Sequence, residues 1–169
     1  YYYDEKLQPM ATEGGFSFER YQYTENAGTK TIFYYKKDGS AMIFDTGYSA
    51  ERITTFAKNE GEKIYLDVNG EVVTLTLGYA EEKWTLNESG QEIERSYYNS
   101  NGEPVNCTDG YAKKLRKYNE QGLLSEIEFL DTNDNPVNCT NGQQRTIWIY
   151  DEQGKEKEVR SLLRVIEFP

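Results

Sequence analysis

Two stretches of sequence decide the expected fold: residues 97–111, YYNSNGEPVNCTDGY, and residues 129–143, FLDTNDNPVNCTNGQ. They start 32 residues apart, and both carry the same Pro-Val-Asn-Cys-Thr segment at the same position. Three earlier segments align with them, so that five copies start near residues 2, 34, 65, 97 and 129. A fixed period between about 20 and 50 residues is typical of repeat architectures. We therefore expect residues 1–169 to form a single domain of tandem repeats of about 32 residues.

Two positions are kept in every copy. An aromatic residue opens each one: Tyr2, Tyr34, Tyr65, Tyr97 and Phe129. A glycine stands thirteen residues later: Gly15, Gly47, Gly78, Gly110 and Gly142. Because glycine adopts positive φ without steric cost, the second position predicts a turn in each copy.

The second half of each unit predicts a β-hairpin. Turn signals such as Asn119-Glu120-Gln121-Gly122 separate short runs with the composition of strands. An Asn or Asp that opens such a turn bonds its own backbone, and the glycine closes it. The expected fold is therefore all-β, with the repeats forming an antiparallel β-meander or a β-hairpin solenoid. At the C-terminal end, the sequence is compatible both with a strand that begins near Val159 and with a short helix across residues 156–166.

Composition removes several classes of function. The formal net charge is −10 and the basic residues are scattered, so we expect no nucleic-acid partner. No apolar run is long enough to cross a bilayer, so we expect no membrane span in this chain. The chain opens at Tyr1 with neither Met nor a signal peptide, which we interpret as a mature or excised boundary.

Catalytic and cofactor motifs are also missing from the sequence. There is no His, no phosphate-binding glycine loop, no dinucleotide fingerprint and no nucleophile elbow. The acidic bend at residues 131–135 resembles a calcium loop in spacing, but Pro136 and Gly142 stand where that loop needs Gly and Glu. We therefore expect no cofactor, no metal site and no enzymatic activity.

Cys107 and Cys139 hold equivalent places in the two stretches quoted above. In a meander with two strands per repeat they would lie roughly 9.5 Å apart, beyond the reach of a disulfide, whereas a solenoid with one strand per turn would bring them within roughly 4.8 Å. A disulfide between them and two free, buried thiols both stay open.

The chain contains fifteen tyrosines. Aromatic residues at fixed repeat positions usually form the stacked core of a thin array. Tyr48, Tyr79 and Tyr111 each follow the repeat glycine, and we consider them candidate ligand-binding residues, forming an exposed row that stacks on sugar rings or on a partner protein.

The unit resembles bacterial cell-surface repeats of the YD, or RHS-like, kind, through Tyr118-Asn119-Glu120-Gln121-Gly122 and Tyr150-Asp151-Glu152-Gln153-Gly154. It is also similar to WG-type repeats through residues 65–70 and 78–80, and less closely to choline-binding wall repeats around residues 33–47. The chain has only two tryptophans, which departs from the aromatic cage of choline-binding repeats. The resemblance implies a bacterial protein that is secreted or displayed on the cell surface.

Together these features favour a non-catalytic extracytoplasmic module that binds protein or a cell-wall or host glycan. One alternative is a structural spacer domain of a larger surface protein. A second alternative is a carbohydrate-active enzyme, because glycoside hydrolysis needs two carboxylates and no histidine.

Overall fold

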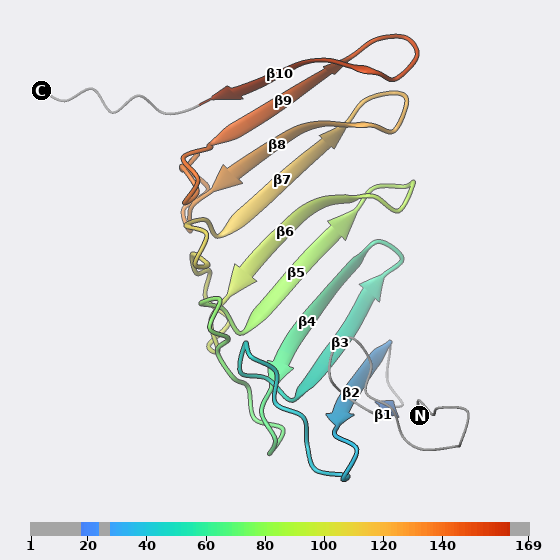
Figure 1. Cartoon of the computed structure of the whole chain (residues 1–169), viewed down its shortest axis with the longest axis vertical. Helices are drawn as coiled ribbons and strands as arrows, with labels where there is room; N and C mark the ends of the chain where they lie inside the picture. The colour runs from blue at the N-terminus through green and yellow to red at the C-terminus, as the bar shows by residue number, and fades with distance from the viewer. Residues whose placement is uncertain (1–17, 24–27, 163–169) are drawn as a thin grey trace, which may run out of the picture.

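The computed structural model describes residues 18–23 and 28–162, which form one antiparallel sheet of ten strands (Figure 1). Each strand pairs with the strand before it and the strand after it in the chain. The strands are β1 (Phe18–Tyr23), β2 (Thr29–Tyr35), β3 (Ala50–Ala57), β4 (Glu60–Leu66), β5 (Glu81–Leu86), β6 (Glu92–Tyr98), β7 (Lys113–Tyr118), β8 (Leu124–Leu130), β9 (Arg145–Tyr150) and β10 (Glu156–Leu162). The prediction of an all-β antiparallel meander is correct, and the sheet is open.

Connections of two kinds alternate along the chain. Tight turns join β3 to β4, β5 to β6, β7 to β8 and β9 to β10, whereas loops of fourteen residues join β2 to β3, β4 to β5, β6 to β7 and β8 to β9. Figure 1 shows the long loops gathered along one edge of the sheet and the tight turns along the other. The two kinds of connection therefore form separate borders.

Three of the four tight turns, those after β5, β7 and β9, have the chemistry that the sequence predicts. Asn119 Oδ1 accepts hydrogen bonds from the amides of Gln121 (3.0 Å) and Leu123 (2.9 Å), and Gly122 has a φ of 76°. Asn87 and Asp151 accept the same pair of bonds in their own turns. The side chain of the first turn residue thus replaces backbone partners that the turn cannot supply.

The long loops are folded and bonded to one another. In the loop before β7, the Cys107 amide donates to the Tyr111 carbonyl at 2.9 Å, and the Gly110 amide donates to the Cys107 carbonyl at 2.8 Å. Each of the last three loops is also bonded to the loop before it, through the amides of Thr76, Thr108 and Thr140, at 2.8–2.9 Å from carbonyls of residues 46, 77 and 109. Because these amides are paired, the loop border is ordered structure rather than loose connection.

A line of aromatic rings crosses the sheet from β2 to β8 beside the loop border and forms much of the hydrophobic core. We call it the aromatic row, and it consists of Tyr34, Phe44, Tyr48, Tyr65, Tyr79, Tyr97, Tyr111 and Phe129. Neighbouring ring centroids lie 4.5–6.2 Å apart, mostly in edge-to-face or tilted arrangements. From Tyr48 onward, loop residues and strand residues alternate along the row, so it fastens the loops to the sheet.

Three further expectations concern the first copy, the C-terminal segment and a membrane span. Tyr2 and Gly15, the markers of the first proposed copy, lie outside the described residues. Residues 156–162 form strand β10 and not a helix, while residues 163–166 of the same segment lie outside the described range. No helix of the described residues has the length and apolar character that crossing a membrane requires.

Candidate functional site

The expected exposed row of tyrosines is wrong. Tyr79 and Tyr111 are only 9% and 5% exposed, and Tyr48 is half-buried. The Tyr79 ring packs against Tyr97 at 4.5 Å between centroids, and Tyr111 packs against Phe129 at 4.6 Å. These tyrosines stand near the ends of the long loops, which fold back so that each ring enters the aromatic row. Their faces are therefore occupied by neighbouring rings and are not open to a sugar.

The ionisation of the row agrees with a structural role. Burial, followed by repulsion from Glu82, raises the pKa of Tyr65 far above its usual value of 10.0. Burial raises the pKa of Tyr48, Tyr79 and Tyr97 in the same way, and that of Tyr111 to about 12. The rings stay neutral at physiological pH, as a packed core requires.

Cys107 and Cys139 are free thiols, each 7% exposed and part of the same buried cluster as the aromatic row. The amides of Phe44, Leu75, Cys107 and Cys139 make one type of hydrogen bond, to the carbonyl four residues later. The position is thus filled by Phe, Leu, Cys and Cys in turn. We conclude that the cysteines occupy a general apolar core position, in which a thiol acts as a small hydrophobic group.

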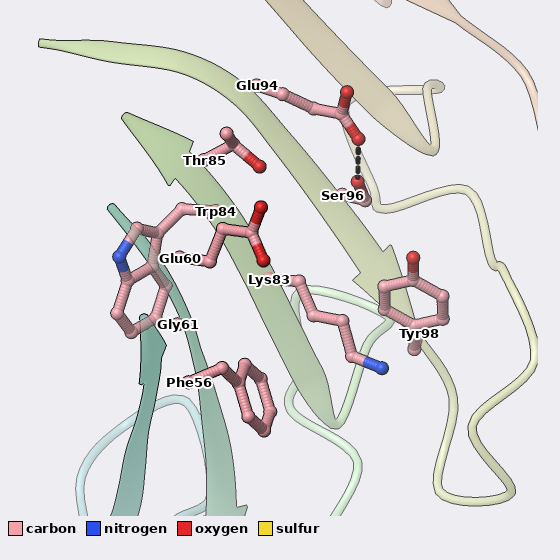
Figure 2. A pocket seen from close by; sticks show the side chains of 9 residues that line it. All are labelled: Phe56, Glu60, Gly61, Lys83, Trp84, Thr85, Glu94, Ser96 and Tyr98. Carbon is pink, nitrogen blue, oxygen red and sulfur yellow. Dashed lines mark hydrogen bonds between the residues drawn. The ribbon is translucent and has the colours of Figure 1, made fainter. Parts of the chain in front are cut away.

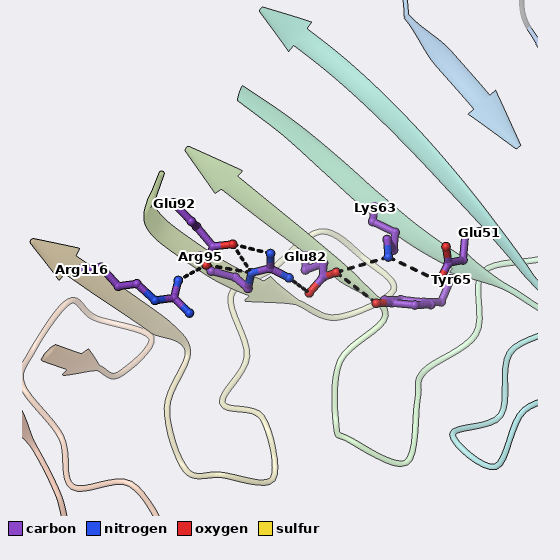
Figure 3. Close-up of polar contacts among 7 residues, drawn as sticks. All are labelled: Glu51, Lys63, Tyr65, Glu82, Glu92, Arg95 and Arg116. Atoms are coloured by element: carbon purple, nitrogen blue, oxygen red, sulfur yellow. Dashed lines mark hydrogen bonds and ion pairs between the residues drawn. The ribbon is translucent and has the colours of Figure 1, made fainter. Parts of the chain in front are cut away.

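A chain of alternating charges crosses one face of the sheet. We call it the ion ladder, and its members are Glu51, Lys63, Glu82, Arg95, Glu92 and Arg116 (Figure 3). Lys63 Nζ lies 3.4 Å from Glu51 and 3.9 Å from Glu82, and Arg95 Nη1 lies 2.7 Å from Glu82. Glu92 contacts both Arg95 and Arg116. The ladder links five strands, from β3 to β7.

A β-bulge makes the central part of this ladder. Thr85 pairs with Glu94 and Leu86 with Glu92, which leaves Ile93 as an extra residue. Alternation along an unbroken strand would place Glu92 and Arg95 on opposite faces. The extra residue restores them to one face, where Arg95 Nε lies 3.1 Å from both carboxylate oxygens of Glu92.

The ladder also contacts the aromatic row. The hydroxyls of Tyr34 and Tyr65 donate to Glu51 (3.2 Å) and Glu82 (3.1 Å). Burial alone would raise the pKa of Glu92, but hydrogen bonds from Arg95 and Arg116 outweigh it, and its pKa lies below the usual 4.5. Glu92 is thus ionised and paired with both guanidinium groups, which suits cross-linking of strands better than proton transfer.

A surface hollow of about 180 Å³ lies over β3 to β6 (Figure 2). We call it the Phe56 hollow, and it is lined by Phe56, Glu60, Gly61, Lys83, Trp84, Thr85, Glu94, Ser96 and Tyr98. Lys83 Nζ lies 4.5 Å from the centroid of the Tyr98 ring and 3.0 Å from Glu81. Ser96 Oγ donates to Glu94 at 3.0 Å. The hollow thus combines aromatic, cationic and carboxylate groups on one surface.

Phe56 is the unusual member of this group. It is 59% exposed, and it is the extra residue of a second bulge, between the Thr55–Gly61 and Ala57–Glu60 pairs. Bulges re-aim side chains and are common beside binding sites. A large aromatic ring is thus held mostly in water on a bulge, at the rim of a hollow that also carries charged groups.

Sequence reasoning missed both the ladder and the hollow. In the sequence, Lys83 and Glu94 look like residues of an ordinary charged strand face. Phe56 comes to lie beside them only through the bulge in β3. The described residues contain no group of three side chains that could hold a metal ion. The one signal in the sequence is Phe56 itself, an aromatic residue two positions before the turn at Lys58-Asn59.

A scan of protein-family models finds no match to this chain, and a search of curated proteins finds no significant similarity.

Proposed function

We propose that this chain is a non-catalytic, extracytoplasmic tandem-repeat module that binds a glycan or a protein at the bacterial cell surface, with the Phe56 hollow as its contact site. The observation that carries the proposal is the 59% exposure of Phe56 on its bulge at the rim of that hollow. Exposed aromatic residues of this kind are typical anchors of binding surfaces.

The recurring contacts support the tandem-repeat part of the proposal. Gly47, Gly78, Gly110 and Gly142 all have positive φ, between 84° and 104°. Adjacent long loops are joined in the same manner, since the amides of Thr76, Thr108 and Thr140 donate to carbonyls of residues 46, 77 and 109 at 2.8–2.9 Å. Units that repeat both their internal turns and their contacts with the next unit behave as a one-dimensional array.

The size and chemistry of the hollow favour a segment of a polymer as its ligand. Pockets for drug-sized molecules usually enclose about 300–1,000 Å³, so a hollow of about 180 Å³ accepts a single ring or side chain. Phe56 and Tyr98 offer apolar rings, while Lys83, Glu60 and Glu94 offer donors and acceptors around them. This combination matches a sugar residue, which presents an apolar face and a rim of hydroxyls. We therefore favour a glycan over a protein.

The experiment is binding of the purified chain to an immobilised panel of glycans and cell-wall fragments. We expect saturable binding to at least one member, weakened by at least about tenfold in Phe56→Ala, as for other aromatic hot spots. Ile43→Ala is the matched control, because Ile43 is a large apolar residue of similar exposure, 57%, that does not line the hollow. Equal binding by Phe56→Ala and the parent chain, or no binding at all, would overturn the proposal.

A carbohydrate-active enzyme is the second candidate, favoured by the presence of Glu60 and Glu94 in one hollow. Glycoside hydrolysis needs two carboxyl groups about 5 to 9.5 Å apart on either side of the scissile bond. Release of reducing ends from any bound glycan, abolished in both Glu60→Gln and Glu94→Gln, would select this candidate.

A spacer domain of a larger surface protein is the third candidate, favoured by the extended order of the sheet from β1 to β10 (Figure 1). It predicts neither binding nor product release, and Phe56→Ala would then have no measurable consequence.

A further inference from the structure

Within the part of the chain that the structure describes, strand β10 pairs with β9 alone, and all seven of its residues are exposed. Val159 is 45% exposed. Its counterpart in β8, 32 residues earlier, is Ile127, which is partly covered because β8 is paired on both sides. The exposure of β10 therefore follows from its open edge.

The backbone groups on that edge can be assigned from the pairing. The Leu162 carbonyl accepts the Gln144 amide at 3.1 Å, so Leu162 turns its backbone groups toward β9. Successive residues of a strand alternate sides, so Val159 and Ser161 direct their amides and carbonyls away from β9. An edge of this kind is a template for another strand.

The preceding interfaces show which residues the edge uses. In β6, residues Glu94, Arg95 and Ser96 pair with β7, and in β8, residues Glu126, Ile127 and Glu128 pair with β9. The equivalent residues of β10 are Glu158, Val159 and Arg160, again 32 residues later. A strand added to β10 would therefore centre its pairing on Val159.

We propose that β10 is a homotypic interaction surface, on which a second copy of this chain pairs its own β10 antiparallel about a two-fold axis at Val159. In that register Val159 lies opposite Val159 of the other copy, and each Glu158 lies opposite Arg160. The two valines exchange backbone hydrogen bonds, and the two Glu158–Arg160 pairs occupy the closer, non-hydrogen-bonded positions that flank them.

The charges of β10 show whether its edge is suited to pair with a second copy or is only protected against pairing. Charged residues on an edge strand usually prevent pairing. Here Glu158 and Arg160 alternate in sign, and they already contact one another within the chain at 2.7 Å. An antiparallel two-fold pairing places opposite charges face to face, whereas a parallel pairing in register would oppose Glu158 with Glu158. This charge pattern disfavours pairing with most other strands, but it is complementary to a second, antiparallel copy of β10.

The test uses two single variants of the full chain and their mixture. Glu158→Lys places a lysine opposite Arg160, and Arg160→Glu places a second glutamate opposite Glu158. Each variant alone should therefore dimerise about tenfold more weakly than the parent chain or not at all. An equimolar mixture restores opposite charges at both positions between unlike chains. The mixture should therefore form dimers again, although each variant still lacks the Glu158–Arg160 ion pair within its own chain.

Sedimentation velocity over a range of concentrations measures the mass, and native mass spectrometry identifies the mixed dimer. Glu88→Lys is the control, since it makes the same charge change at an exposed turn residue and should dimerise as the parent chain does. Thermal melts confirm that each variant is folded. The proposal is overturned by a parent chain that stays monomeric, by single variants that still dimerise, by a mixture that does not recover, or by assemblies larger than two.

Discussion

Trp84 of β5 lies against Gly61 of β4, so closely that a methyl group at Gly61 would stand 2.4 Å from Trp84 Cζ2 and 2.8 Å from Cε2. The two residues are direct cross-strand partners. Gly61 does not have a positive φ, so its backbone alone does not require glycine. Glycine is required instead because the Trp84 indole fills the space that a side chain at Gly61 would need. This is the arrangement in which an aromatic ring covers a glycine of a neighbouring strand.

Gly61→Ala should therefore lower the free energy of unfolding by about 1–3 kcal/mol, the usual cost of overpacking. The same substitution in a Trp84→Ala background should cost much less, because its main obstacle has been removed. Denaturant unfolding of the four proteins in this double-mutant cycle measures the coupling. Equal costs in both backgrounds would show that Trp84 does not occupy the place assigned to it.

Glu92→Gln should lower the free energy of unfolding at neutral pH by about 1–3 kcal/mol, because it leaves Arg95 and Arg116 without their shared carboxylate. The pKa of Glu92 is depressed in the folded chain, so its contribution is present above its unfolded value, near 4.5, and is lost as the pH falls through the lower folded value. The parent and the variant should thus converge in acid.

Urea unfolding across the acidic range, with Glu88→Gln as a matched substitution at an exposed turn residue, checks this convergence. A constant difference between the parent and Glu92→Gln at every pH would contradict the ion ladder as drawn in Figure 3.

Alkaline pH should destabilise the chain through the aromatic row. The folded pKa of Tyr97 is raised, by burial first and then by Tyr111, so the neutral hydroxyl favours folding below the unfolded pKa of 10.0. That contribution is lost as the pH rises toward the folded value. Tyr97→Phe, which keeps the ring but cannot ionise, should make the alkaline fall in stability shallower. Ultraviolet absorbance of the phenolates, followed with unfolding, measures both effects, and identical pH profiles would refute them.

Both cysteines should be reduced thiols that are shielded from solvent, and they should not form a disulfide. Cys107 and Cys139 are buried, so a thiol reagent should label them slowly in the native chain and rapidly in denaturant. Addition of a reductant should leave the melting temperature unchanged. An intact mass that corresponds to an oxidised pair after purification would contradict the free thiols.

The turns and the order of the strands could be predicted because they depend on local chemistry. Asn119 and Gly122 form their bend through contacts within five residues of chain, which the sequence displays directly. The burial of the Tyr79 side chain could not be predicted from such local contacts. It stands near the end of a fourteen-residue loop, and only the packing of its ring on Tyr97 determines that it is buried.

The polar features were hidden for a related reason. Strand alternation places Glu92 and Arg95 on opposite faces, and a bulge at Ile93 reverses this. Phe56 is directed to its hollow by another bulge. A bulge has no reliable sequence signature, because it depends on how two strands align across the sheet. The residues that carry the proposed binding function were therefore the least visible in the sequence.

The structural equivalence of successive units is tested most directly by amide hydrogen exchange at Thr76, Thr108 and Thr140. Each amide donates to the loop before it, at 2.9, 2.9 and 2.8 Å respectively. If the units stack alike, all three should be protected to a similar degree, and far more than the amides of exposed turn residues such as Glu88. Rapid exchange at these threonines, or protection at one and not at its counterparts, would contradict the stacked array.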